Sequence, residues 1–215
     1  MIIAVDHGNS AIKTVNHVFT SGLREYPDKP PMVSEWVQYQ GGYFVLTERR
    51  IPLMLDKTDN QDFFILTLFA IAKELMSMGS VQPWHEIDLA VGLPPEHFVK
   101  QRQSFAAYFK REELTFSYNN VTFNIKLRNV LVFPQAYAAV VPQGSRLKDM
   151  PQCYIVDIGG YTTDILLLQE SRPDIDMCRS LEYGVIDMCN EIIGLVNTKH
   201  GIQLSEKQIV AAVQG

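Results

Sequence analysis

Nine residues late in the chain, VDIGGYTTD at 156–164, read as an apolar strand that ends in Asp-x-Gly, a turn of small residues, and the start of a returning strand. Near the start of the chain, VDHGNSAIK at 5–13 has the same plan. Aligning the two copies, which lie about 150 residues apart, matches Asp6 with Asp157, Gly8 with Gly159, and Lys13 with Asp164. Two copies of one device predict two related half-domains that face each other across a cleft.

The residue types in these hairpins suit phosphate and a divalent cation. A tight glycine-containing hairpin exposes successive backbone N–H groups as an anion nest, and glycine lets the backbone approach a ligand closely. Lys13 would place a point charge on a phosphate oxygen. Asp6 and Asp157 would repel phosphate, so they are better placed to hold Mg²⁺ through its retained waters. A single strand–Asp-x-Gly turn is commonly structural, but the pair favours a site for a Mg-nucleotide.

Composition describes an acidic globular chain. The 215 residues carry a net charge of −5, and 47% are hydrophobic and 20% charged, which argues against intrinsic disorder. A protein that binds DNA phosphates directly is usually basic, so we expect no direct contact with nucleic acid. The three cysteines form no CxxC pair and are expected to be reduced thiols in a cytoplasmic protein.

The sequence also argues against targeting to a membrane. Its first residues lack the basic and apolar regions of a signal peptide. The most apolar run, residues 63–72, falls short of the ~20 residues that span a bilayer. We therefore expect a protein with no membrane partner.

The hydrophobic pattern mixes strands with helices and so predicts an α/β layered fold. The clearest helix is 59–78, which is apolar on two faces, as expected of a helix buried between layers; Asp59 or Asn60 would cap it. We expect further helices at 96–110, 135–141, 184–199 and 205–213, and strands at 2–5, 11–18, 37–46 (as a pair), 87–93, 114–118, 121–133, 153–156, 162–168 and 175–181. The polar stretch 142–151 is the expected boundary between two domains, 1–148 and 149–215.

The two hairpins resemble the phosphate-1 and phosphate-2 loops of the superfamily of actin, sugar kinases and heat-shock-chaperone ATPases. FPQAYAA at 133–139 resembles that superfamily's first connecting helix. Bacterial actin-like proteins of the ParM type are most similar, at 43–50, 56–58, 89–94, 155–164 and 181–187, and the resemblance covers essentially the whole chain. It implies an actin-like ATPase fold, with an RNase-H-like domain I followed by an incomplete RNase-H-like domain II.

The resemblance also implies roles for individual residues. Asp6 and Asp157 would hold hydrated Mg²⁺, and Gln135 falls where the family places the group that orients the attacking water. ParM-like proteins often have Glu there and actin has Gln; Gln cannot take a proton, so it would position water rather than act as a base. For Gln135 alone, a plain position at a helix N-terminus is an equal alternative. The residues that would contact the phosphates of ATP or ADP, or of GTP, are Gly8, Asn9, Ser10 and Lys13, with Gly159, Gly160, Tyr161 and Thr162 in the opposing loop.

The function implied is that of the N-terminal part of a ParM-like ATPase. Such a protein binds Mg·ATP between its domains, polymerises head to tail, and segregates a plasmid or mobile element. Its partners would be further copies of itself and a DNA-binding adaptor. An adaptor is more compatible with the negative net charge of the chain than direct contact with DNA. Two alternatives stay open: a small-molecule kinase of the same superfamily, whose catalytic Asp we do not identify outside the hairpins, and a non-catalytic interaction or capping module.

Two further expectations concern the adenosine pocket and the polar residues near the hairpins. The only Gly-Gly pairs are 41–42 and 159–160, so we expect the family's glycine-rich adenosine motif to be absent. ATP hydrolysis is therefore expected of the full-length family rather than assigned to this chain. We expect His7 to be a solvated turn residue and Lys57, in the charged stretch 56–59, to have a surface role.

Overall fold

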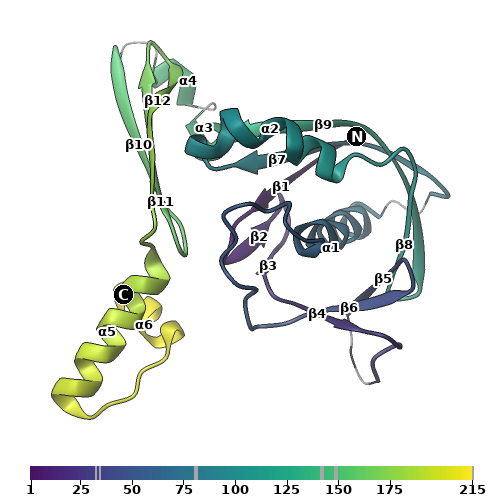
Figure 1. Cartoon of the computed structure of the whole chain (residues 1–215), viewed down its shortest axis with the longest axis horizontal. Helices are drawn as coiled ribbons and strands as arrows, with labels where there is room; N and C mark the ends of the chain where they lie inside the picture. The colour runs from purple at the N-terminus through teal and green to yellow at the C-terminus, as the bar shows by residue number, and fades with distance from the viewer. Residues whose placement is uncertain (32, 34, 80–81, 141–142, 148–149, 215) are drawn as a thin grey trace.

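The structure is a computed structural model that describes residues 1–31, 33, 35–79, 82–140, 143–147 and 150–214. Two separate sheets with helices packed on them make up the chain (Figure 1). The predicted α/β class is confirmed. In Figure 1 the smaller sheet stands upright beside the larger one, and the last two helices lie at its lower end.

The larger sheet grows outward from the strand that leads into the first hairpin. β1 (Ile2–His7) alternates exposed and buried residues, pairs antiparallel with β2 (Ala11–Lys13), and pairs parallel with β7 (His85–Leu93). Among the described residues the sheet has nine strands, in the order β3-β2-β1-β7-β9-β8-β5-β6-β4. The remaining strands are β3 (Val18–Thr20), β4 (Leu23–Tyr26), β5 (Trp36–Tyr39), β6 (Gly42–Leu46), β8 (Leu114–Tyr118) and β9 (Val121–Pro134).

Two helices cover this sheet and close its core. α1 (Asp62–Ser77) is the helix predicted at 59–78, and nearly all of its first fourteen residues are buried. It begins later than expected, after Gln61, and the side chain of Asn60 accepts the N–H of Asp62 at 2.8 Å. α2 (Pro95–Phe109) follows a proline turn and buries Phe105 and Phe109 against the same core.

The strand predicted at 11–18 is wrong, because β2 ends at Lys13 and β3 begins only at Val18. The chain turns between them, with Thr14 N–H donating to the His17 carbonyl at 2.8 Å. Glu74 of α1, only 2% exposed, holds this turn by accepting from Thr14 Oγ1 and from the Asn16 backbone and side chain. Burial alone would raise the pKa of Glu74, but these hydrogen bonds lower it below its ordinary value. The edge strand β4 was not predicted.

The smaller sheet repeats the start of the larger one. It has the order β10-β11-β12, all antiparallel, with β10 (Gln152–Ile158), β11 (Thr163–Gln169) and β12 (Arg172–Leu181). α5 (Val185–His200) and α6 (Glu206–Gln214) follow it. Its own small core contains Leu166, Leu168 and Cys178, packed against residues of the short helices α3 (Tyr137–Val140) and α4 (Gly144–Leu147).

The segment that joins the sheets departs from expectation at one residue. The helix predicted at 135–141 begins only at Tyr137, so Gln135 lies in the turn before it. The predicted boundary between residues 148 and 149 falls outside the described residues. The division into domains 1–148 and 149–215 therefore stays a prediction.

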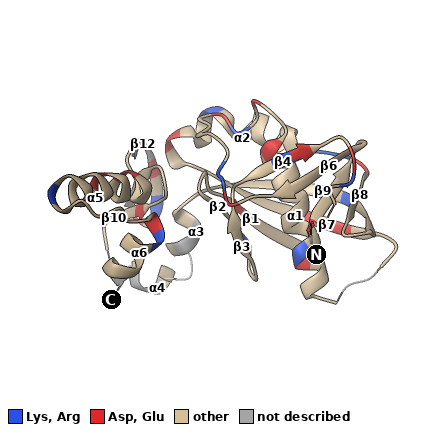
Figure 2. Cartoon of the chain, turned by 90° about the horizontal axis from the view of Figure 1, so that it is seen from below, with Lys and Arg blue, Asp and Glu red and all other residues tan. Residues whose placement is uncertain are grey.

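Charged residues of both signs are spread along the described parts of the chain (Figure 2). Among these residues no helix is long and apolar enough to cross a membrane.

Candidate functional site

The two hairpins have the same register, as their repeated sequence predicts. In hairpin 1 (residues 5–13), β1 and β2 pair Asp6 with Lys13. In hairpin 2 (residues 156–164), β10 and β11 pair Asp157 with Asp164. The acidic residue and its partner are thus placed identically in the two hairpins, and the structural equivalence of the two copies is confirmed.

In each hairpin the glycine of the Asp-x-Gly sequence packs closely against the returning strand. A Cβ added to Gly8 would lie 2.6 Å from the carbonyl oxygen of Ala11, and one on Gly159 would lie 3.0 Å from that of Thr162. In hairpin 2 the Gly159 N–H also donates to the Thr162 carbonyl at 2.8 Å. A side chain at either glycine would therefore push the hairpin's strands apart.

The tips of the two hairpins touch. A Cβ on Gly160 would lie 2.4 Å from the Cβ and 2.5 Å from the Oγ of Ser10. Behind hairpin 2, the backbone N–H groups of Val185 and Ile186 donate to the carbonyls of Gly159 and Gly160 at 3.0 and 2.9 Å. The start of α5 therefore fixes hairpin 2 from its far side, while hairpin 1 contacts it at the tip.

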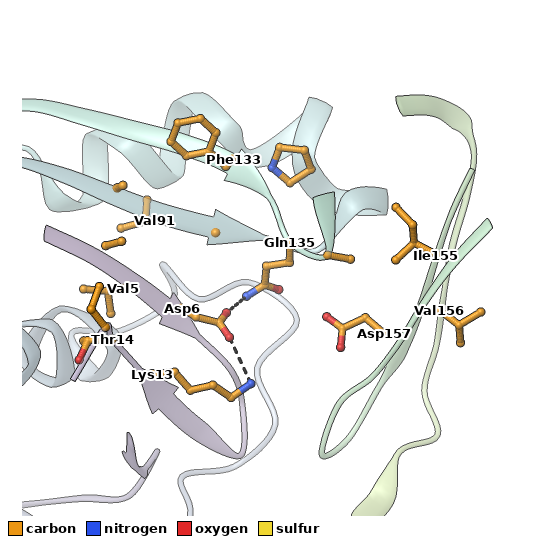
Figure 3. Close-up of a pocket in the computed structure, with 16 residues that line it drawn as sticks. Val5, Asp6, Lys13, Thr14, Val91, Phe133, Gln135, Ile155, Val156 and Asp157 are labelled. Atoms are coloured by element: carbon orange, nitrogen blue, oxygen red, sulfur yellow. Dashed lines mark hydrogen bonds and ion pairs between the residues drawn. The ribbon is translucent and has the colours of Figure 1, made fainter. Parts of the chain in front are cut away.

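A cavity of about 580 Å³ lies between the sheets and is lined by both hairpins (Figure 3). Asp6 stands at its centre: its Oδ1 accepts from Gln135 Nε2 at 2.5 Å, and its Oδ2 lies 3.3 Å from Lys13 Nζ. Asp157 points toward this group from β10 (Figure 3). The rest of the lining is mainly apolar and includes Val5, Val91, Phe133, Ile155 and Val156.

Gln135 reaches Asp6 because of the turn that follows β9. Its N–H donates to the Leu93 carbonyl at 2.7 Å, which continues the pairing of β9 with β7. Gly92 leaves room for its side chain, since a Cβ there would lie 2.8 Å from Gln135 Cγ. Ala136 then takes a positive φ of 64° and turns the chain into α3. Gln135 is therefore a turn residue that faces the cavity, not the first residue of a helix.

His7 is not the solvated turn residue that we expected. It is fully buried, and its Nε2 lies 2.7 Å from Thr67 Oγ1 among the rings of Phe63, Phe105 and Phe109. Burial, with a smaller contribution from the charge of Lys57, lowers the pKa of His7 to about 3. Because side chains alternate along β1, Asp6 faces the cavity while His7 faces the core.

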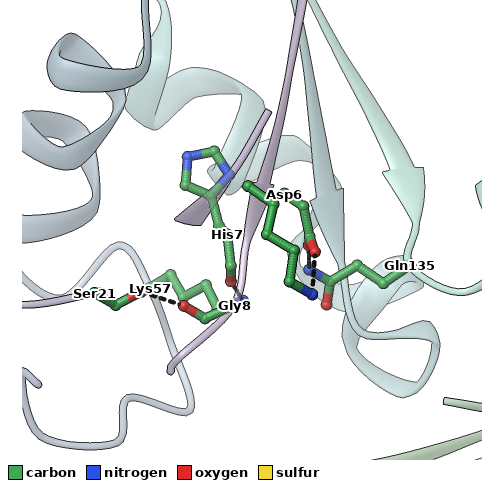
Figure 4. Close-up of polar contacts among 7 residues, drawn as sticks. Asp6, His7, Gly8, Ser21, Lys57 and Gln135 are labelled. Carbon is green, nitrogen blue, oxygen red and sulfur yellow. Dashed lines mark hydrogen bonds and ion pairs between the residues drawn. The ribbon is translucent and has the colours of Figure 1, made fainter. Parts of the chain in front are cut away.

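Lys57 is not a surface residue either. It is 4% exposed, on the loop between β6 and α1, and its Nζ donates to the carbonyl of His7, the last residue of β1 before the turn of hairpin 1 (Figure 4). Beside it, Ser21 Oγ donates to the Gly8 carbonyl at 2.6 Å. Burial lowers the pKa of Lys57 to about 8, although the charges of Asp6 and Asp164 act in the opposite direction.

The other predicted residues fall around these contacts rather than in the large cavity. Asn9 and Thr162 line a second, smaller cavity of about 120 Å³ together with Lys57 and His97. Tyr161 is half-buried at the tip of hairpin 2 and lines neither cavity. The structure thus brings Asp6, Lys13, Gln135 and Asp157 together and places the remaining predicted residues in the hairpin turns.

Contacts beyond the hairpins hold the two sheets together. Arg50, after β6, donates to both carboxylate oxygens of Glu206 in α6, at 2.7 and 3.0 Å. The Ser180 N–H in β12 donates to Glu96 of α2 at 2.7 Å. These bonds join residues far apart in the sequence and link the part of the chain that carries the larger sheet to the part that carries the smaller one.

The donor set suits a hydrated cation rather than one enclosed by protein ligands. Within the described part of the chain, no group of three or more His, Cys, Asp or Glu side chains could hold a metal ion. Asp6 and Asp157 contribute one carboxylate from each side of the large cavity. Mg²⁺ prefers oxygen ligands and keeps several waters when it binds with phosphates, so this pair fits it.

Comparison with known proteins identifies relatives of both parts of the chain. Residues 4–137 match the family model of the N-terminal domain of actin-like proteins. Residues 155–215 match the C-terminal domain of archaeal MreB-like actin homologues. No curated protein sequence matches the chain.

Solved structures show the same fold at low sequence identity. An archaeal actin homologue, Ta0583, superposes with a TM-score of 0.78 at 15% identity, over 96% of this chain and 69% of its own; the same protein has been solved with ADP, with a TM-score of 0.76. A filament of AlfA from B. subtilis plasmid pLS32 gives 0.68 at 20% identity, over 94% and 80% of the chains. A ParM filament from Clostridium botulinum gives 0.69 at 19%, over 98% and 72%.

Proposed function

The chain belongs to the family of actin-like proteins, and from this premise we propose that it binds a Mg-nucleotide between its two hairpins and self-associates into filaments. The observation that carries the proposal is the pair of hairpins in identical register, which touch at their tips and border one cavity. A structural neighbour that has been solved with ADP supports a nucleotide as the ligand.

Each polar residue of the cavity then has a task. Asp6 and Asp157 would hold a hydrated Mg²⁺ ion, which would supply charge neutralisation to the phosphates of the nucleotide. Lys13, whose side chain is 56% exposed, reaches a phosphate oxygen as a point charge. The turns at Gly8–Ser10 and Gly160–Thr162 offer backbone N–H groups to the phosphates, whereas the Gly159 N–H is already used within hairpin 2.

Gln135 orients the water that attacks the terminal phosphate. Its amide already donates to Asp6, so its carbonyl oxygen remains free to accept a hydrogen bond from that water. Because an amide takes no proton, Gln135 contributes positioning and the proton leaves with the phosphate products. This makes Gln135, Asp6 and Asp157 the residues on which ATP hydrolysis depends.

The cellular role follows from assembly. Several structural neighbours are filaments, and head-to-tail contacts that do not close generate filaments. We assign to this chain the segregation of a plasmid or mobile element in the cytoplasm, through a DNA-binding adaptor.

Titration calorimetry tests nucleotide binding directly. The 215-residue chain is expected to bind ADP in the presence of Mg²⁺ and to lose most of this affinity in EDTA. Asp157→Asn should weaken binding about tenfold, because losing one charge-assisted contact to a hydrated ion costs roughly 1.4 kcal/mol. Asp176→Asn, an exposed carboxylate in the same small sheet, is the matched control and should bind like the wild type.

Two results would contradict nucleotide binding at this site. One is a wild-type chain that binds neither ADP nor a non-hydrolysable ATP analogue, which would leave a non-catalytic interaction module. The other is an Asp157→Asn variant with undiminished affinity, which would move the nucleotide away from the hairpins.

Sedimentation tests assembly. In Mg²⁺ and a non-hydrolysable ATP analogue, the pelleted fraction of the chain is expected to rise steeply above a critical concentration, as for a head-to-tail polymer. Mg²⁺ without nucleotide is the control. A chain that stays monomeric by light scattering at every concentration would refute self-association.

A further inference from the structure

Lys57 is a buried cation that the proposed nucleotide chemistry does not use. It lies beneath hairpin 1, 4% exposed, with the His7 carbonyl as its hydrogen-bond acceptor. Burying an ammonium costs free energy unless opposite charges compensate it. One carbonyl does not neutralise a full charge, so the compensation must come from carboxylates nearby.

Those carboxylates come from both hairpins. The charges of Asp6 in hairpin 1 and Asp164 in hairpin 2 both favour the charged form of Lys57. Asp164 is 5% exposed, and its Oδ1 accepts from Ser180 Oγ at 2.5 Å. The charge of Lys57, on the loop between β6 and α1, therefore acts on a carboxylate in each hairpin.

The repeat explains why hairpin 2 needs a cation from outside. Hairpin 1 pairs Asp6 with Lys13 across its strands, whereas hairpin 2 pairs Asp157 with Asp164 at the same register position. Like charges directly opposite each other are destabilising. Burial, together with the charge of Asp157, raises the pKa of Asp164, and Lys57 is among the groups that counteract this.

The smaller cavity shows that Lys57 and hairpin 2 meet in one space. It is lined by Lys57, by Asn9 and Thr162 from the two hairpin turns, and by Ser180, which holds Asp164. The other titratable side chains that line this cavity are Glu96, His97 and Glu182. Glu96 already accepts the Ser180 N–H at 2.7 Å, and the charge of Lys57 favours the charged form of the buried Asp164.

We propose that Lys57 is a positioning residue that couples the two hairpins, holding the His7 carbonyl of hairpin 1 and balancing Asp164 of hairpin 2. The hairpins can then close on phosphate without leaving two carboxylates uncompensated in hairpin 2. The claim about phosphate rests on the proposed function, whereas the coupling of the hairpins does not.

A double-mutant cycle on ADP affinity tests the coupling. Lys57→Met keeps the length of the side chain and removes its charge; Asp164→Asn keeps an acceptor for Ser180 Oγ and removes the carboxylate's charge. Each single variant is expected to weaken ADP binding about tenfold. The double variant is also expected to weaken it about tenfold, rather than a hundredfold, because the free-energy effects of coupled residues do not add. Effects that multiply to about a hundredfold would overturn the coupling.

Hydrogen exchange of the nucleotide-free chain tests the same inference independently of ligand. Lys57→Met is expected to speed amide exchange in hairpin 2, at 159–163, about tenfold, although the hydrogen bond of Lys57 is to hairpin 1. Lys126→Met, at an exposed lysine of β9, is the control and should leave exchange unchanged. Unchanged exchange in hairpin 2 of Lys57→Met would refute the inference, even in a chain that binds ADP.

The two readouts also separate this inference from the proposed function. If the wild-type chain binds no nucleotide but Lys57→Met still speeds amide exchange in hairpin 2, nucleotide binding is refuted and the coupling between the hairpins is supported. Thermal unfolding checks that the Lys57→Met variant still folds, since removing one partner of a buried charge pair destabilises a protein.

Discussion

Lowering the pH from 6.5 to 4 is expected to reduce the free energy of unfolding of this chain by about 3 kcal/mol through His7 alone. The pKa of this imidazole is lowered to about 3 in the folded chain, from an ordinary value of 6.5. Between these two values the unfolded chain binds a proton that the folded chain does not. His7 therefore makes its full contribution to the free energy of unfolding above pH 6.5, and this contribution is lost as the pH falls toward 3.

The cause is the environment of the ring. His7 Nε2 and Thr67 Oγ1 share a hydrogen bond at 2.7 Å, and the same hydroxyl lies 2.7 Å from the Phe63 carbonyl. The aromatic rings of Phe63, Phe105 and Phe109 surround the imidazole and offer no opposite charge to an imidazolium. Protonation would place a second cation beside the buried Lys57.

Denaturant unfolding between pH 7 and 4 measures this effect. The variant His7→Phe keeps an aromatic ring among Phe63, Phe105 and Phe109 but removes the titration. Its stability should fall less steeply with acid than that of the wild type, and the difference between the two slopes isolates His7 from the carboxylates that both proteins share. His200→Gln, at an exposed histidine, is the control; parallel curves for wild type and His7→Phe would contradict the prediction.

The burial of His7 could have been predicted from the sequence, but that of Lys57 could not. The alternation that buries Ile3 and Val5 on one face of β1 continues to His7. The period-2 pattern therefore indicated that His7 is buried, whereas we placed it in the turn. Lys57 has no such signal, because its acceptor lies fifty residues earlier in the chain. A charged residue in a polar stretch gives no local indication of a distant partner.

The hairpins were predictable for the opposite reason. Register in a tight hairpin is set by the turn and the strands on either side, which are contiguous in sequence, so the alignment of the two copies predicted two equivalent hairpins. The break between β2 and β3 was not predictable in this way, since Glu74 holds it from α1. Gln135 is a mixed case: Pro134 marks the end of β9, but the positive φ of Ala136 that turns the chain is not encoded in its residue type.

The contact between the hairpin tips leads to the second large effect. Gly160→Ala is expected to weaken binding of ADP and Mg²⁺ up to about a hundredfold, because overpacking costs roughly 1–3 kcal/mol. The new Cβ would lie 2.4 Å from the Cβ of Ser10, an atom fixed to the backbone. The hairpins must therefore separate, and the distance between Asp6 and Asp157 must increase with them.

A matched rescue distinguishes this clash from other effects of the substitution. Removing the opposing side chain in Ser10→Gly/Gly160→Ala restores the space at the tip, so the double variant is expected to recover most of the lost affinity and of the melting temperature. Ile186 Cδ1, at 3.2 Å from the same Cβ, is the far end of a flexible side chain and can move away in both variants. A Gly160→Ala chain that melts and binds ADP like the wild type would show that the tips are not in contact in solution. A double variant as impaired as the single one would place the defect within hairpin 2 instead of between the hairpins.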